Sequence, residues 1–152
     1  VAAIIMGIPM MLYFTKIKKF GMILIFELVN GIVLLLTGMG PDALICGVVI
    51  GLIVEFIIKS GDYRSAKRAV FGYALLMLTS CANYIHWLNA SAEWLNKNAA
   101  TYGQDFMYTI SGWLDYWWMF PAVILSAFIG GILGGLLGRA VLKKHFLRSG
   151  LV

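Results

Sequence analysis

Aromatic and small polar side chains alternate between residues 83 and 120, and this stretch is the best candidate in the chain for a binding site. All five tryptophans of the chain lie in it. Flat apolar surfaces with a few directional polar groups are what a small-molecule pocket requires. We therefore expect the substrate to be bound by some of Asn83, Tyr84, His86, Trp87, Trp113, Tyr116 and Trp117. The alternative is an aromatic belt, because Trp and Tyr favour the headgroup zone at the ends of membrane spans.

No catalytic or metal-binding motif accompanies these residues. His86 is the only histidine of the stretch, and a lone histidine is more often a hydrogen-bonded structural residue than a haem ligand or a partner of a carboxylate. Cys46 and Cys81 lie in apolar segments without a CxxC pair. The motifs GxxxxGK[ST], HExxH and GxSxG are absent. We expect no enzyme activity, no catalytic residue, no metal and no cofactor.

Two acidic residues lie inside apolar segments, where an ionisable side chain is a functional candidate by default. Glu27 is followed three residues later by Asn30, on the same face of a helix. A buried hydrogen-bonded pair and a polar contact to a substrate or partner helix are both open for Glu27. Glu55 precedes Lys59 by four residues, and this spacing predicts a structural ion pair near one membrane surface.

The elements that position these residues are expected to be membrane-spanning helices. The chain has 152 residues, of which 61% are hydrophobic and 12% charged, and its mean hydropathy is +0.88. A soluble domain would carry about 25% charged residues. A span needs on the order of 20 residues, so the composition predicts an all-α transmembrane helix bundle that forms a single domain over residues 1–152.

Five spans are expected. They cover about residues 1–15, about 20–37, the apolar first half of 46–68, about 69 to 83–87, and about 116–141. Gly38, Gly40 and Pro41 are expected to end the helix of the second span. A long polar and aromatic connection fills the region before 115. The first segment would cover only about 22 Å of a hydrocarbon core of about 30 Å, and the chain lacks an initial Met. We therefore expect six spans in the intact protein, with the first helix missing here.

The basic residues orient these spans. With five spans, 11 of the 12 Lys and Arg residues fall on one membrane face, and only Lys97 falls on the other. Lys and Arg beside spans are retained on the cytoplasmic side. We expect a multi-pass protein of the plasma membrane with its C-terminus in the cytoplasm. The formal charge of +5 then reflects topology and not nucleic-acid binding.

Glycines recur four residues apart in the last expected span and at Gly47 and Gly51. Small residues at this spacing let two helix backbones approach closely. Packing inside the bundle is one interpretation, and docking of a separate membrane subunit is the other. The candidates for partner-subunit packing are Gly130, Gly131, Gly134, Gly135 and Gly138.

Four segments together resemble the Trep_Strep family of small integral membrane proteins. They are TKIKKFG (15–21), LTGMG (36–40), GLIVEFIIKSGDYRSAKR (51–68) and GGLLGRAVLKKHFLRSGLV (134–152). The resemblance leaves out the region 82–115. It implies the substrate-binding S component of an energy-coupling factor (ECF) transporter, an ABC-type importer that takes up a vitamin-like or other flat aromatic micronutrient from outside.

The resemblance also implies partners, namely a transmembrane T component and two cytoplasmic ATPase subunits. A tetrapyrrole such as haem is an alternative cargo. A non-transporting membrane scaffold is the alternative function, in which the glycine faces serve assembly and the aromatic residues are only interfacial. The identity of the substrate and the roles of Glu27 and Glu55 stay open.

Overall fold

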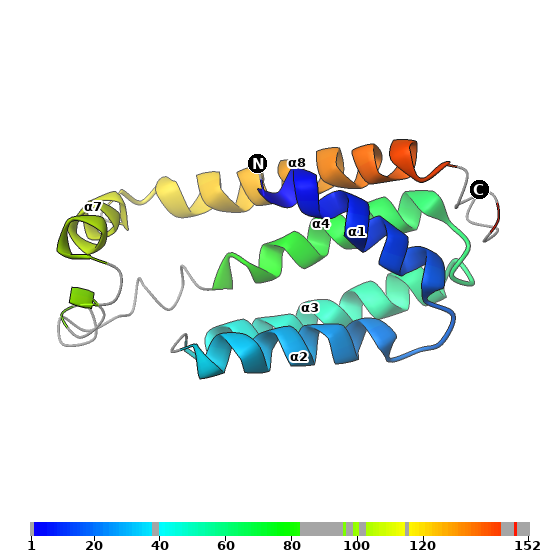
Figure 1. Ribbon diagram of the computed structural model, residues 1–152, viewed down its shortest axis with the longest axis horizontal. Coiled ribbons are helices and arrows are strands. Elements are labelled where there is room, and N and C mark those ends of the chain that lie inside the picture. Colours follow the sequence, from blue (N-terminus) through cyan, green and yellow to red (C-terminus); the bar gives the residue numbers. More distant parts are fainter. Residues whose placement is uncertain are drawn as a thin grey trace.

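The computed structural model describes residues 2–37, 40–82, 96, 99–100, 103–114, 116–143 and 148. In this part of the chain there are six α-helices and no strand: α1 (Ala2–Lys16), α2 (Met22–Leu36), α3 (Asp42–Lys59), α4 (Ala66–Thr79), α7 (Gln104–Leu114) and α8 (Met119–Val141). Figure 1 shows that α1, α2, α3, α4 and α8 form an elongated bundle, and that α7 lies beyond one end of it. The predicted all-α architecture is confirmed.

The five bundle helices correspond to the five apolar segments of the sequence, with shifted ends. Helix α2 starts after Gly21, whose φ of 96° lies in the left-handed region that favours glycine. Helix α3 starts at Asp42, earlier than predicted, because Pro41 provides a rigid first position and the Asp42 carboxylate complements the helix dipole. Helix α4 starts after Ser65, whose side chain accepts a hydrogen bond from the backbone N–H of Arg68.

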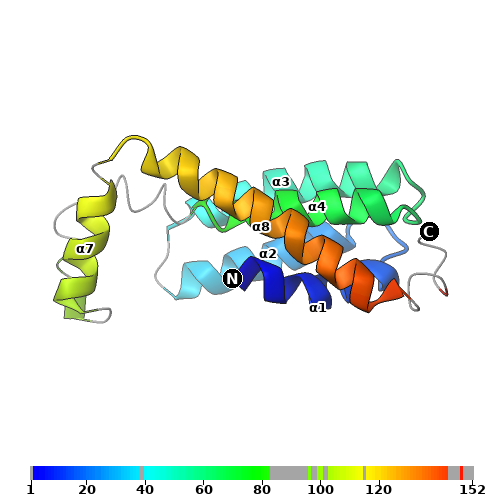
Figure 2. The ribbon, with the colours of Figure 1, turned by 90° about the horizontal axis from the view of Figure 1, so that it is seen from above.

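Helix α7 was not predicted, because its polar and aromatic residues read as a connection. Figure 2 shows that α7 runs across the direction of the bundle helices. Met107 is buried, whereas Phe106, Tyr108 and Trp113 are exposed. Exposed aromatic side chains at the end of a helical bundle are typical of a membrane interface.

Each helix of the bundle packs on at least one neighbouring helix. Helix α8 packs on α1 and α4, α2 packs on α3, and α3 packs on α4. The largest fully buried side chains of the core are Tyr73, Met11, Ile17, Ile23, Glu55 and Val54. Many large hydrophobic side chains lie on the outside of the bundle, Leu36 and Ile25 among them. An exposed apolar surface of this extent is typical of a protein that faces lipid.

The glycines of α8 are covered by helices of the same chain. A Cβ added at Gly131 would lie 2.6 Å from Ala74 Cα on α4, and one added at Gly138 would lie 2.6 Å from the carbonyl oxygen of Gly7 on α1. A Cβ at Gly134 would overlap the backbone of α1. This is the internal-packing interpretation of the glycine pattern. The candidate face for packing against a separate subunit is therefore already occupied within this chain.

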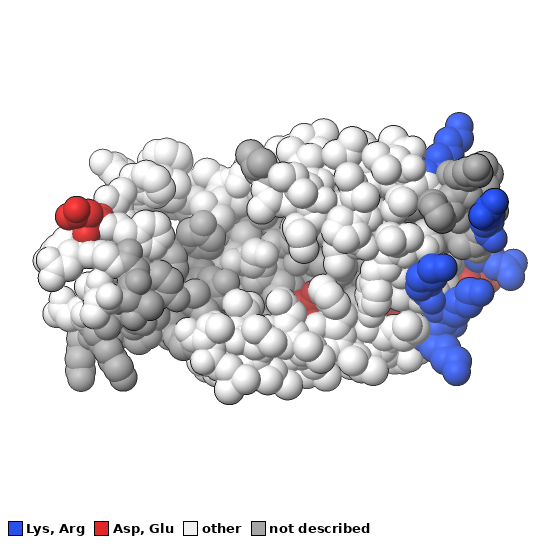
Figure 3. Space-filling model, viewed as in Figure 1, with Lys and Arg blue, Asp and Glu red and all other residues white. Residues whose placement is uncertain are grey.

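Basic side chains gather at one end of the bundle, where α1, α3 and α8 end and where α2 and α4 begin. Figure 3 shows this concentration of Lys and Arg on the face in view, and we call it the basic end. Among the described helices, α8 alone is long and apolar enough to span a bilayer by length and composition, while α1 and α2 are apolar but shorter.

Candidate functional site

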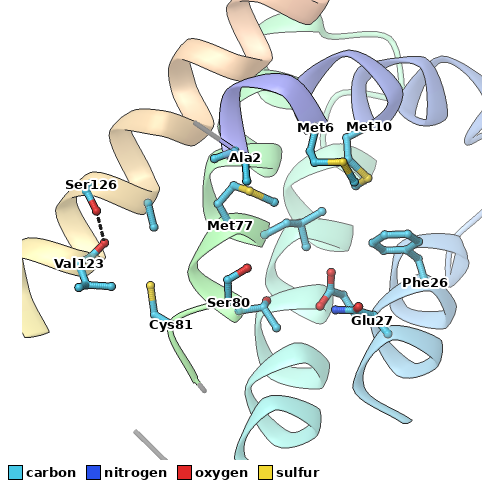
Figure 4. A pocket seen from close by; sticks show the side chains of 15 residues that line it. Ala2, Met6, Met10, Phe26, Glu27, Met77, Ser80, Cys81, Val123 and Ser126 are labelled. Carbon is cyan, nitrogen blue, oxygen red and sulfur yellow. Dashed lines mark hydrogen bonds between the residues drawn. The ribbon is translucent and has the colours of Figure 1, made fainter. Parts of the chain in front are cut away.

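A cavity of about 500 Å³ lies between α1, α2, α4 and α8. Its residues come from the first half of α1, the middle of α2, the C-terminal end of α4 and the first half of α8 (Figure 4). Small-molecule sites commonly have volumes of about 300–1,000 Å³. The volume therefore suits a small organic molecule.

Most of the cavity wall is apolar and rich in sulfur. Met6 and Met10 are one turn apart on α1, Met77 lies on α4, and Phe26 lies on α2. The thioether of methionine is polarisable and makes favourable contacts with aromatic rings. Flat rings of different shapes can therefore pack against this wall.

The polar part of the wall contains two buried oxygen atoms that lack a hydrogen bond of good geometry. Glu27 is 2% exposed and Thr79 is 4% exposed. Glu27 Oε2 and Thr79 Oγ1 have no partner of good hydrogen-bond geometry among the described residues, although the Thr79 side chain lies beside the Glu27 carboxylate and interacts with it. Asn30 and Ser80 lie in the same cavity. Since buried polar atoms are nearly always hydrogen-bonded, these two oxygens are positions where a water molecule or a polar group of a ligand would be stabilised.

Helix α3 provides the space in which the Glu27 side chain lies. A Cβ at Gly47 would lie 3.1 Å from Glu27 Oε2, and a Cβ at Gly51 would lie 3.2 Å from Glu27 Cγ. Figure 4 shows the Glu27 carboxylate pointing toward the side of the cavity that holds Ser80 and Met77. The glycine pair in α3 thus accommodates an acidic side chain as well as a neighbouring helix.

A comparison with protein families places the whole arrangement in a membrane. The family model described as hypothetical bacterial integral membrane protein (Trep_Strep) matches residues 1–148. The chain belongs to the Trep_Strep family. No curated protein and no solved structure matches it. Membership of the Trep_Strep family confirms the family resemblance and means that lipid surrounds the apolar exterior of the bundle.

The aromatic residues predicted to bind substrate do not line this cavity of the Trep_Strep protein where they are described. Trp113 is 57% exposed, Tyr116 is 56% exposed and Trp117 is 86% exposed, and none of the three is in the cavity wall. Their exposure favours the interfacial aromatic belt. The remaining candidates lie outside the described residues: Asn83, Tyr84, His86 and Trp87. A substrate site built from these aromatic residues stays a prediction.

Glu55 has a structural role that differs from the predicted ion pair. Its Oε2 accepts a hydrogen bond of 2.9 Å from the backbone N–H of Ile23 in the first turn of α2. The residue before α2 is Gly21, which has no side chain to cap the helix, so Glu55 caps α2 from the neighbouring helix. Lys59 Nζ lies 4.9 Å from the centre of the Phe20 ring. The predicted pairing of Glu55 with Lys59 is therefore wrong.

A second, more polar cavity of about 250 Å³ lies at the basic end, between the loops that join α1 to α2 and α3 to α4. Asp62 and Tyr63 have φ values of 50° and 57° there, a conformation that costs energy for residues other than glycine. The Tyr63 hydroxyl donates a hydrogen bond of 3.3 Å to Glu55 Oε1. Burial of the hydroxyl, and then the Glu55 carboxylate, raise the pKa of Tyr63 above its ordinary value.

Two residues of the main cavity were missed by reasoning from sequence. Thr79 is the last residue of α4 and Ser80 is its C-cap, and single hydroxyl side chains in an apolar segment carry no specific signal in the sequence. Glu27 and Asn30 were singled out, because an acid inside an apolar segment is a strong signal. Only the orientation of α2 relative to α4 shows that Glu27 and Asn30 line the same cavity as Thr79 and Ser80.

Proposed function

We propose that this Trep_Strep protein binds a small organic molecule in the cavity between α1, α2, α4 and α8, as the substrate-binding S component of an ECF-type importer. The observation that carries the proposal is a ligand-sized cavity with two buried oxygens, on Glu27 and Thr79, that lack a hydrogen bond of good geometry. The family resemblance supplies the transport context. An ionisable side chain inside a membrane bundle is costly and marks a functional candidate by default.

The proposed topology has five crossings with the basic end in the cytoplasm. Lys and Arg at the ends of α1, α3 and α8 and at the start of α4 support this orientation. The cavity is lined by the start of α1 and the end of α4, which point away from the basic end. A ligand would thus enter from outside the cell, on the side where α7 lies.

The proposed energy source is a separate set of subunits, because the sequence carries no P-loop motif. The resemblance implies a T component and two ATPases. Since α1 and α4 already cover the glycine face of α8, a T component would have to contact another part of the apolar exterior.

The described part of the cavity wall suits a vitamin-like ring better than haem. Haem iron is usually held by an axial side chain such as histidine. None of the described residues in the cavity wall is a histidine, and His86 lies outside the described residues. The thioether and aromatic wall together with a few oxygens suits an organic ring that carries its own polar groups.

Purification from native membranes in a mild detergent tests the transport context. The expected result is that a T component and two ATPases elute with the protein in a defined ratio, identified by mass spectrometry of the complex. Elution of the protein without these subunits, under conditions that keep other ECF complexes intact, would contradict the ECF role and favour the scaffold.

A further inference from the structure

Glu27 has no positively charged partner in the part of the chain that the structure describes. No Lys, Arg or His is among the described residues of the cavity wall, and the described Lys and Arg residues lie mainly at the basic end (Figure 3). An acidic side chain at membrane depth is costly unless it is paired or hydrogen-bonded. The glycines of α3 nevertheless leave room for this carboxylate at 3.1 Å from the Gly47 Cβ position.

The rest of the wall completes a site for one kind of group. Thr79 and Ser80 offer hydroxyls and Asn30 offers an amide near the carboxylate, so a nitrogen with several N–H bonds could be satisfied from more than one side. Phe26 and the methionines offer polarisable surfaces that attract cations and rings. A ligand carboxylate or phosphate would instead be repelled by Glu27.

We infer that the ligand of this cavity is a ring compound with a positively charged nitrogen, such as an amine or amidine, and that Glu27 is the residue that selects it. This inference rests on the proposed function. The nitrogen donates a charge-assisted hydrogen bond to Glu27 Oε2, and the ring lies against the methionines and Phe26. Charge-assisted hydrogen bonds are roughly twice as strong as neutral ones, so the charge dominates selectivity between ligands of equal size.

Three indole compounds of similar size separate charge from shape: tryptamine is a cation at pH 7, tryptophol is neutral and indole-3-acetate is an anion. Binding to the purified protein is measured by isothermal titration calorimetry in detergent. We expect tryptamine to bind at least about tenfold more tightly than tryptophol and indole-3-acetate to bind most weakly. Equal binding of tryptophol or indole-3-acetate would overturn the inference, and so would binding of none of the three.

The Glu27→Gln variant assigns the selectivity to one residue. The variant should bind tryptamine at least about tenfold more weakly than the unmodified protein does. Its affinity for tryptophol should stay within about twofold of that of the unmodified protein. Asp105→Asn is the matched control, because it makes the same acid-to-amide change at an exposed position on α7 that is not in the cavity wall. This control should bind tryptamine as the unmodified protein does.

A second measurement separates recognition from folding. Removing an unpaired buried charge should not lower stability, so ligand-free Glu27→Gln should unfold at the same or a higher temperature. A lower midpoint would show that Glu27 is structural and would overturn the inference. If a neutral or acidic molecule is released from the native protein, the inference fails while the proposed binding function stands.

Discussion

The carboxylate of Glu27 on α2 lies against Gly47 on α3, with 3.1 Å between Glu27 Oε2 and the position of a Cβ at Gly47. The contact joins two features that the sequence shows separately, an acid inside an apolar segment and a pair of glycines four residues apart. Because of it, the position of the carboxylate in the cavity depends on how closely α2 and α3 approach.

Substitution of Gly47 by alanine should therefore weaken ligand binding. The new Cβ would press on Glu27 Oε2 and move it, which should cost about 0.5–1.5 kcal/mol of tryptamine binding, the net value of one hydrogen bond. Titration calorimetry of Gly47→Ala measures the loss. Gly112→Ala is the control, because a Cβ at Gly112 meets nothing within 4 Å. Unchanged affinity in Gly47→Ala would show that the carboxylate position is not set by α3.

Gly134→Ala should destabilise the isolated protein. Its Cβ would overlap the carbonyl oxygen of Ala3, so α1 and α8 would have to separate. Overpacking of this kind typically costs about 1–3 kcal/mol. Unfolding in mixed detergent micelles with increasing SDS measures the free energy of unfolding, again with Gly112→Ala as the control. If Gly134→Ala left stability unchanged but prevented assembly with another subunit, the glycine face would be a docking surface after all.

Glu55 should matter for stability much more than Lys59. Replacing Glu55 by alanine leaves the buried N–H of Ile23 without its acceptor, at a cost of about 2 kcal/mol. Lys59→Ala removes an exposed cation–π contact with Phe20, worth about 0.5–1 kcal/mol. Glu55→Gln keeps an acceptor oxygen and should lie between them. Equal losses for Glu55→Ala and Lys59→Ala in the same unfolding assay would support an ion pair instead of a cap.

Tyr63 should make stability depend on alkaline pH. Its pKa is raised above the ordinary value of 10.0, first by burial and then by Glu55. The folded state therefore holds the phenolic proton more tightly than the unfolded state does. The contribution of Tyr63 is fully present below pH 10 and is lost as the pH rises through the raised pKa. Thermal unfolding between pH 8 and about 11 should show a steeper decline for the unmodified protein than for Tyr63→Phe. Parallel curves would contradict this role.

The sequence predicts the bundle well, because long apolar segments between glycine, proline and lysine leave few alternatives to helices. Glu27 was a candidate because an acidic side chain inside an apolar segment is unusual. Thr79 was missed because its role depends on how α4 faces α2, which periodicity does not reveal. Helix α7 was missed because Phe106 and Tyr108 sit among polar residues, so that no continuous apolar face is visible.

The wall of the described cavity does not include the described aromatic residues of the sequence-based prediction, Trp113, Tyr116 and Trp117. Tryptophans at the end of a span carry a strong signal both for binding and for an interface, and composition does not separate the two. Trp117 lies at the surface. The described cavity is built instead from methionines and short polar side chains, and short polar side chains are common between membrane helices whether or not a site is present. These side chains line one cavity only because α1, α2, α4 and α8 pack around it.

The central claim, that the cavity holds a small molecule, is tested most directly by mass spectrometry of what the protein releases on denaturation after purification from native membranes. Ala127→Phe should fill the cavity, whose wall includes Ala127, while Leu125→Phe adds the same ring on the exposed side of α8. We predict near-stoichiometric release of one molecule from the unmodified protein and from Leu125→Phe, and little from Ala127→Phe. Release of nothing, or equal release from all three, would contradict the account.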